Sequence, residues 1–289
     1  MNVLLRTVFN KPEMLQLSIK YEQIAREHFD DDYFTIFVVD FGAYPKCIEV
    51  INAYPFKHRI IMRPQRHYVC ANIMEGLKTA SEMSPDFIIN MEDDVILHKT
   101  YFEYVRKAHE LVKDTKYSVI TTWGYSPAGD PTILKQSDYS CGPGTIISND
   151  FFNRYLSNYA NVGYYNNWAG TIKDINKLNE HNPIAKYDIN NMSHLDWDGV
   201  MNRLVDYASF KEDMHAYSSL CFRLLHIGFC GFNRHGKFPI GIDSFEDRLE
   251  FLEKHIFDPD MLSKLDGLYN DYHTFDPNLD TWDGSLRIE

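Results

Sequence analysis

Short apolar runs alternate with segments of helical spacing through the first part of the chain. The runs are rich in β-branched and aromatic residues and stop at polar or turn residues, as buried strands do. Behind Pro12, the apolar residues Met14, Leu17, Tyr21 and Ile24 recur three or four positions apart, which predicts a helix beginning near the proline. The pattern predicts strands over 3–8, 34–39, 58–62, 87–89 and 117–122, and helices over 12–24, 47–53, 72–81 and 101–112.

This alternation predicts an α/β fold with a mostly parallel central sheet and helices on both faces. Ligands of open α/β sheets bind beyond the carboxyl ends of the strands. Asp40 and the triplet Glu92, Asp93 and Asp94 both follow predicted strands. The sequence therefore predicts that these acidic residues lie at the ligand-binding edge of the sheet.

The rest of the chain is less regular. A turn rich in Gly and Pro falls at 141–144, and the polar composition beyond residue 258 predicts a loosely held extension. We expect one catalytic domain over 1–257, with a donor-binding half at 1–115 and an acceptor half at 116–257, followed by the extension at 258–289. Its further predicted elements are a helix over 149–156, a surface loop over 157–193, a helix over 196–207 and a strand within 223–238.

Charge and composition narrow the classes of protein. The chain of 289 residues has 29 Lys and Arg against 41 Asp and Glu, a formal net charge of −12, which repels polyphosphates at long range. Five scattered cysteines include no C-x-x-C pair, so a structural zinc site is not expected. No apolar run approaches the roughly 20 residues that span a bilayer, and the N-terminus does not read as a signal peptide. We expect a cytoplasmic protein without a membrane span.

The acidic triplet is the strongest chemical signal. Three consecutive carboxylates raise one another's pKa unless a cation lies among them. Carboxylate oxygens suit Mg²⁺ or Mn²⁺, with phosphate oxygens completing the coordination, and such a metal neutralises charge on a departing diphosphate. The alternative is an acidic helix cap or a solvated turn. The apolar strand before the triplet and the aromatic helix after it favour the metal.

The triplet and several later segments resemble one family. Residues 88–95 read Ile-Ile-Asn-Met-Glu-Asp-Asp-Val, and Tyr-Phe-Glu-Tyr follows at 101–104. These segments resemble the metal-binding part of the GT-A N-acetylglucosaminyltransferases, in particular N-acetylglucosaminyltransferase I and its O-mannose-linked relative. Similar segments follow in the family's order at 119–123, 141–147, 196–201 and 223–238, so that the resemblance spans about 3–255.

The resemblance implies roles on the donor side. Asp94 would be the direct metal ligand, with Asp93 and Glu92 binding metal, metal-bound water, ribose or sugar. Asp40 would meet the nucleobase, and Arg6 would lie near the base or the diphosphate. An ordinary arginine at a strand end is the alternative for Arg6.

The resemblance also implies roles on the acceptor side. Inverting transfer needs a carboxylate that takes the proton of the acceptor hydroxyl, and Asp198 or Asp196 would supply it. Either residue could instead cap the helix that follows, and Gly199 with Val200 departs from the family's pattern here. Arg223 and His226 would contact the diphosphate, or His226 would complete the metal shell, although a structural histidine is the alternative.

The predicted function is transfer of a sugar from a nucleotide-diphosphate donor, a UDP-sugar, to an acceptor hydroxyl with inversion. The acceptor could be a glycan, a lipid-linked sugar, a protein or a hydroxymethylated DNA base, as for an enzyme of a bacterium or a virus-infected cell. DNA is disfavoured by the net charge, unless basic residues such as Arg63 and Arg66 form a local patch. A nucleotidyltransferase or metal phosphohydrolase, and a non-catalytic sugar-binding module on the same fold, are the alternatives.

Overall fold

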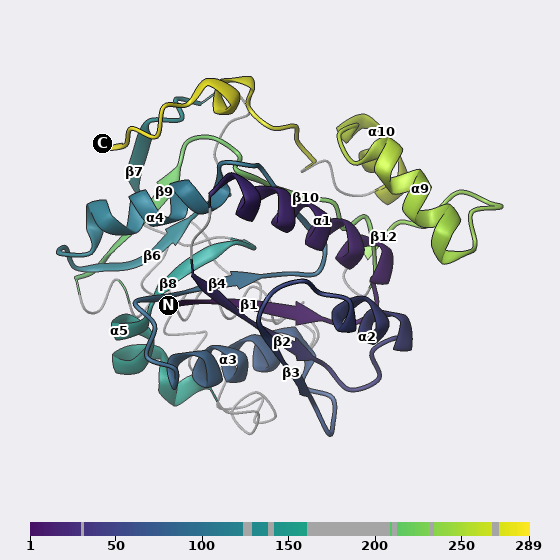
Figure 1. Cartoon of the computed structure of the whole chain (residues 1–289), viewed down its shortest axis with the longest axis horizontal. Helices are drawn as coiled ribbons and strands as arrows, with labels where there is room; N and C mark the ends of the chain where they lie inside the picture. The colour runs from purple at the N-terminus through teal and green to yellow at the C-terminus, as the bar shows by residue number, and fades with distance from the viewer. Residues whose placement is uncertain are drawn as a thin grey trace, which may run out of the picture.

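A nine-stranded sheet runs through the computed structural model, in the order β13-β7-β9-β6-β8-β4-β1-β2-β3 (Figure 1). The structure describes residues 1–29, 32–123, 129–137, 142–160, 209, 213–231, 234–267 and 272–289. Residues 161–193 of the loop predicted over 157–193 lie outside these residues, as does the predicted helix over 196–207 with Asp196 and Asp198.

Four parallel strands from the first part of the chain form one half of the sheet. Because helices cover both faces, β1, β2 and β4 are almost wholly buried and apolar. The strands are β1 (Asn2–Val8), β2 (Tyr33–Val39), β3 (His58–Met62) and β4 (Phe87–Met91). They are joined by α1 (Pro12–His28), α2 (Pro45–Asn52) and α3 (Tyr68–Ser81).

The other half of the sheet is mixed. β8 (Thr145–Ser148) lies antiparallel between β4 and β6 (Tyr117–Thr121), and β9 (His215–Ser219) is parallel to β6. β7 (Ile133–Ser137) is antiparallel to β9, and β13 (Arg287–Ile288) adds a parallel edge strand to β7. The sheet is thus mostly parallel, as predicted.

The two faces of the sheet have separate cores. Side chains of β1 and β2 alternate, so that Leu5 and Val38 pack against α3, whereas Leu4 packs with α4 (Tyr101–Val112) and Phe37 with α1 and α2. The α3 face also holds α5 (Asn149–Phe151), the π-turn η1 (Phe152–Leu156) and the 3₁₀ turn η2 (Ser157–Tyr159). Figure 1 shows α3 and α5 on one side of the sheet, with α1 and α4 on the other. The predicted α/β architecture is confirmed.

Two short strand pairs lie outside the main sheet, and α9 (Phe245–His255) and α10 (Pro259–Asp266) pack against α1 and not against the sheet. β5 (Val95–Leu97) pairs antiparallel with β10 (Leu224–His226), and β11 (Cys230–Gly231) pairs with β12 (Arg234–His235). α9 and α10, with Ile256 directly after α9, bury Leu252, Ile256 and Leu262 in a cluster with Met14 and Leu17 of α1. This packing places the later part of the chain on the outer side of α1.

The segment from 258 onward is not the loosely held tail that its polar composition predicts. It forms α10, buries Leu279 in η3 (Pro277–Thr281) and contributes β13 to the sheet. Trp282 covers the guanidinium of Arg223 at 4.3 Å. A few well-placed apolar side chains therefore fix a segment whose average composition is polar. No helix in the described part of the chain has the length and apolarity needed to cross a membrane.

Candidate metal centre

Asp94 lies at the centre of a buried cluster of charged side chains. The acidic triplet connects β4 to β5, and Asp94 is fully buried there. Its Oδ2 accepts a hydrogen bond from the ammonium of Lys11 and lies 3.2 Å from Nε2 of His226. Its Oδ1 is also buried and has no hydrogen-bond partner among the residues that the structure describes. A buried carboxylate oxygen with no partner is costly in free energy, unless a cation or another donor occupies the place beside it.

His226 reaches Asp94 because β10 pairs with β5. In this pairing His226 lies opposite Val95, and the amide of the next residue, Ile227, donates to the carbonyl of Asp94 at 2.9 Å. One ligand atom each from Glu92, Asp94 and His226 lies within 4.8 Å of the other two. Two carboxylates and an imidazole suit Mn²⁺ or Mg²⁺, with the imidazole favouring the softer Mn²⁺.

Gly228 makes room for this cluster. A Cβ atom at this position would lie 2.0 Å from Oδ2 of Asp94 and 3.0 Å from Nε2 of His226, so that any larger residue would displace one of them. The partnerless Oδ1 of Asp94, the nearby imidazole and the glycine therefore fit a site for a divalent cation.

Asp93 points to a different partner. Its Oδ2 accepts a hydrogen bond from the amide of Phe9, 3.1 Å away, in the loop after β1. Burial raises the pKa of Asp93 to about 6, although Lys11 opposes the shift, and the charge of Asp94 adds to it. Asp93 thus joins the β1 loop to the triplet, and its predicted role as a metal ligand stays a prediction.

The charges around Asp94 compensate one another. Burial disfavours its ionised form, but His226 and Lys11 outweigh burial and hold the pKa of Asp94 well below its ordinary value. Burial likewise disfavours the protonated forms of Lys11 and His226, but the carboxylates of the triplet, chiefly Asp94, together outweigh it and raise both their pKa values. Asp94 is therefore a carboxylate held between the ammonium of Lys11 and the imidazole of His226.

Lys11 is the member of this cluster that sequence reasoning missed. It stands just before Pro12, between the end of β1 and the first turn of α1. A cation directly after the first strand of a parallel sheet is a usable signal, because that position faces the ligand-binding edge.

Asp40 lies at the same edge, at the end of β2. Its backbone amide donates to the carbonyl of Val8 on β1, 3.2 Å away. Its Oδ1 accepts from the amides of Phe41 and His67 at 2.9 and 2.8 Å, and its Oδ2 lies 3.4 Å from Nε of Arg66. The structure thus brings Asp40 to the edge where the triplet lies, as the strand ends predict.

The two arginines predicted near the donor have fully buried side chains with protein partners. Arg6 donates to Glu22 and Ser18 of α1, and its NH1 reaches the carbonyl of Glu92 at 3.3 Å. Arg223 donates to the carbonyl of Pro131 at 2.6 Å, and the rings of Tyr104 and Trp282 cover its guanidinium. Arg6 therefore contacts the backbone of the triplet, whereas Arg223 binds the backbone just before β7.

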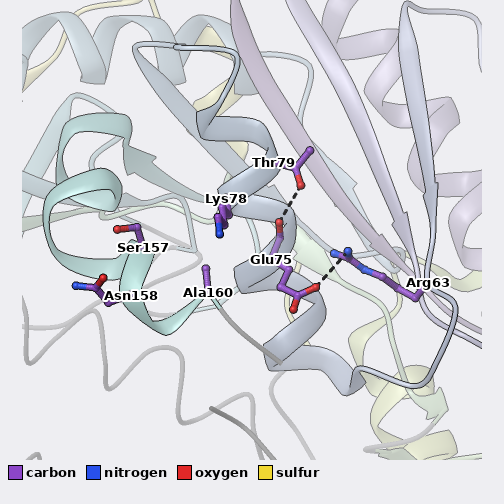
Figure 2. Close-up of a pocket in the computed structure, with 7 residues that line it drawn as sticks. All are labelled: Arg63, Glu75, Lys78, Thr79, Ser157, Asn158 and Ala160. Carbon is purple, nitrogen blue, oxygen red and sulfur yellow. Dashed lines mark hydrogen bonds and ion pairs between the residues drawn. The ribbon is translucent and has the colours of Figure 1, made fainter. Parts of the chain in front are cut away.

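A separate polar cavity of about 490 Å³ opens between α3 and η2 (Figure 2). Arg63, at the end of β3, reaches the carboxylate of Glu75 at 3.3 Å, and the Thr79 hydroxyl donates to the Glu75 carbonyl. Glu75 also lies 3.1 Å from the ring of His67, whose amide binds Asp40. Polar contacts thus join this cavity to Asp40, but none of the three clustered metal-ligand candidates lines it.

Comparisons with known proteins find distant structural likeness only. No family model matches the sequence, and no curated protein matches it. The crystal structure of S. aureus TarS 1-349 matches with a TM-score of 0.43 and 9% identity, covering 73% of this chain and 72% of that one. The complex of TarS 1-349 with UDP-GlcNAc gives 0.40 and 9%, covering 53% and 46%, and the UDP complex gives 0.41 and 10%, covering 53% and 48%. In the two complexes this chain spans about half of the TarS length, and likeness this distant does not define an activity.

Proposed function

We propose that this chain is a metal-dependent glycosyltransferase that uses a nucleotide-diphosphate sugar, with UDP as the nucleotide. The observation that carries the proposal is the Glu92, Asp94 and His226 cluster, in which one buried oxygen of Asp94 has no partner in the described part of the chain. The cluster follows the carboxyl end of β4, which is where α/β sheets bind their ligands. The order of motifs shared with the N-acetylglucosaminyltransferase I family supports the same reading.

Glu92, Asp94 and His226 would hold Mn²⁺ or Mg²⁺. A divalent cation bound there supplies charge that stabilises the departing diphosphate. Lys11 contributes a further positive charge beside the carboxylates, and an ammonium is a suitable point charge for a phosphate oxygen. Gly228 keeps the ligand side chains close to one another.

The nucleoside would lie along the ends of β1 and β2, near Asp40. Asp40 is held in place by two backbone amides, so its side chain has a fixed direction. Arg66, which pairs with Asp40, also covers the ring of Phe9 at 4.1 Å. The Asp40 carboxylate therefore lies beside the flat stack of the Arg66 guanidinium on the Phe9 ring. A carboxylate and a flat surface together suit a nucleobase.

Transfer would proceed with inversion, with Asp198 or Asp196 as the base that removes the proton of the acceptor hydroxyl. Neither residue is among those that the structure describes, and the acceptor class stays open between a glycan, a lipid-linked sugar, a protein and a modified DNA base.

Hydrolysis of the donor tests the proposal without an acceptor. The protein is incubated with UDP-sugars, with Mn²⁺ or with EDTA, and the products are separated. Slow, Mn²⁺-dependent release of free sugar and UDP supports a transferase. Release of UMP would instead favour the nucleotidyltransferase or phosphohydrolase class, and UDP-sugar binding without turnover would favour a sugar-binding module.

A further inference from the structure

The acidic triplet rests on a buried network of charged and polar side chains from β1 and α1. Arg6, Ser18 and Glu22 are completely buried beneath it. Nε and NH2 of Arg6 contact Oε2 of Glu22 at 2.9 and 2.7 Å, and NH1 donates to the Ser18 hydroxyl at 2.8 Å. This network lies on the α1 face of the sheet, directly behind the loop that carries the proposed metal ligands.

Two members of the network bind the backbone on both sides of Asp94. Arg6 NH1 donates to the carbonyl of Glu92 at 3.3 Å, and the Ser18 hydroxyl donates to the carbonyl of Val95. From the opposite side, Ile227 N donates to the carbonyl of Asp94. The backbone is therefore held at three carbonyls between Glu92 and Val95, and two of these contacts depend on Arg6 and Ser18.

We propose that Arg6 and Ser18 are positioning residues for the cation site. By holding the carbonyls of Glu92 and Val95, they fix the direction in which the side chains of Glu92 and Asp94 leave the backbone. This inference rests on the proposed function for its metal. It gives Arg6 a role behind the loop in place of the direct contact with base or diphosphate that the family resemblance implies.

Arginine is the residue that this geometry requires. Its planar fork presents Nε and NH2 to Glu22, while NH1 serves both Ser18 and the Glu92 carbonyl. A lysine keeps the charge but has a single ammonium, which cannot span Glu22 and the loop with the same fixed directions. Partners that orient metal-binding groups commonly affect metal affinity by about 10–100-fold.

The chain offers a matched control at the other end of the same network. Thr35 is a fully buried hydroxyl, as Ser18 is, and it accepts a hydrogen bond from Arg26 at 3.0 Å and shares one with Tyr54 at 2.7 Å. Arg26 in turn binds Glu22 at 2.8 Å. No hydrogen bond joins Thr35 to the triplet, so Thr35→Val disturbs the network without touching the loop.

The test compares Ser18→Ala and Thr35→Val in the full chain. Mn²⁺ affinity is measured by calorimetry well below the melting temperature, and amide hydrogen exchange is measured over residues 92–97. We expect Ser18→Ala to weaken Mn²⁺ binding by about tenfold and to speed exchange in that segment. Thr35→Val should lower the melting temperature without either effect, and Arg6→Lys should resemble Ser18→Ala.

Two results would overturn the inference. One is equal change in both hydroxyl variants, which would make the network a general support. The other is unchanged affinity and exchange in Ser18→Ala. If the wild-type protein binds no Mn²⁺, the metal assignment of the proposed function fails, and the exchange measurement alone then decides the positioning role: faster exchange over 92–97 in Ser18→Ala alone supports it.

Discussion

Asp93 and Asp94 are neighbours in the sequence but have opposite electrostatic surroundings. Asp94 lies between Lys11 and His226, which hold its pKa well below the ordinary value, whereas burial raises the pKa of Asp93 to about 6. Successive side chains point in different directions here, so each carboxylate meets its own partners. Asp93 therefore takes up a proton at a much higher pH than Asp94, and below about pH 6 this relieves the repulsion between two adjacent buried carboxylates.

Asp94→Asn keeps the shape of the side chain and removes its charge. We expect Mn²⁺ affinity to fall below detection in calorimetry and Mn²⁺-dependent donor hydrolysis to be lost, because the amide replaces the buried carboxylate of the proposed metal cluster and a neutral amide is a poorer ligand for a hard cation. Asp130→Asn is the control, since Asp130 is an exposed carboxylate that pairs with Arg287. Wild-type Mn²⁺ affinity in Asp94→Asn would remove this residue from the site.

The chain just after β10 passes very close to the loop between β4 and β5. Gly228→Ala would place a methyl group 2.0 Å from Oδ2 of Asp94, so the carboxylate or the imidazole must move. We expect a loss of Mn²⁺ affinity of at least about tenfold, with a reduction of about 1–3 kcal/mol in the free energy of unfolding.

Gly241→Ala separates the effect of the contact from that of backbone strain. Gly241 has a positive φ of 88° but no atom within 4 Å of an added Cβ, so its substitution strains the backbone and adds no clash. This variant should lose stability and keep wild-type Mn²⁺ affinity. Equal Mn²⁺ affinity in Gly228→Ala and Gly241→Ala would contradict the close-approach argument.

The predictable elements were those whose pattern is local. β1, β2, β3, β4 and β6, with the helices between them, follow from apolar runs and helical spacing, and their carboxyl ends placed Asp40 and the triplet. β5, β7 and β9 were not predicted, because these short strands depend on partners distant in the sequence. The contact of His226 with Asp94 depends on one such pairing. The buried partners of Arg6 and Arg223 were likewise invisible, since a sequence does not show what lies beneath a strand.

At the scale of the whole molecule, the C-terminal segment is attached through titratable groups. His98 precedes α4, and its ring lies 5.0 Å from the ring of Phe275 and 3.7 Å from the carboxylate of Asp280. Its Nδ1 shares a hydrogen bond with Thr100. Burial lowers the pKa of His98 to about 4, against the attraction of Asp280. The folded protein therefore keeps this imidazole neutral.

Acid should lower the free energy of unfolding through the protonation of His98. In the unfolded chain the imidazole takes up a proton near pH 6.5, but in the folded chain only near pH 4, so the unfolded state binds more protons between these values. The contribution of His98 is present in full above pH 6.5 and is lost as the pH falls towards 4, a reduction of about 1–3 kcal/mol in the free energy of unfolding.

Urea unfolding at pH 4.5, 5.5, 6.5 and 7.5 measures this effect in the wild type and in His98→Asn. The variant keeps a polar group near Thr100 but has nothing to titrate, so its free energy of unfolding should fall less steeply below pH 6.5. Carboxylates titrate in both proteins and cancel in the difference. Parallel pH curves would show that His98 does not account for the acid response.

The pairing of β5 with β10 has a consequence for refolding. Contacts between segments far apart in a chain form late, because the entropy cost of closing a long loop comes before the favourable energy of the contacts. A chain that had assembled only its parallel half would carry Glu92 and Asp94 but lack His226 beside them. Mn²⁺ binding during refolding would therefore report when β10 pairs with β5. In stopped-flow experiments, metal binding should lag behind the recovery of the helical circular dichroism signal.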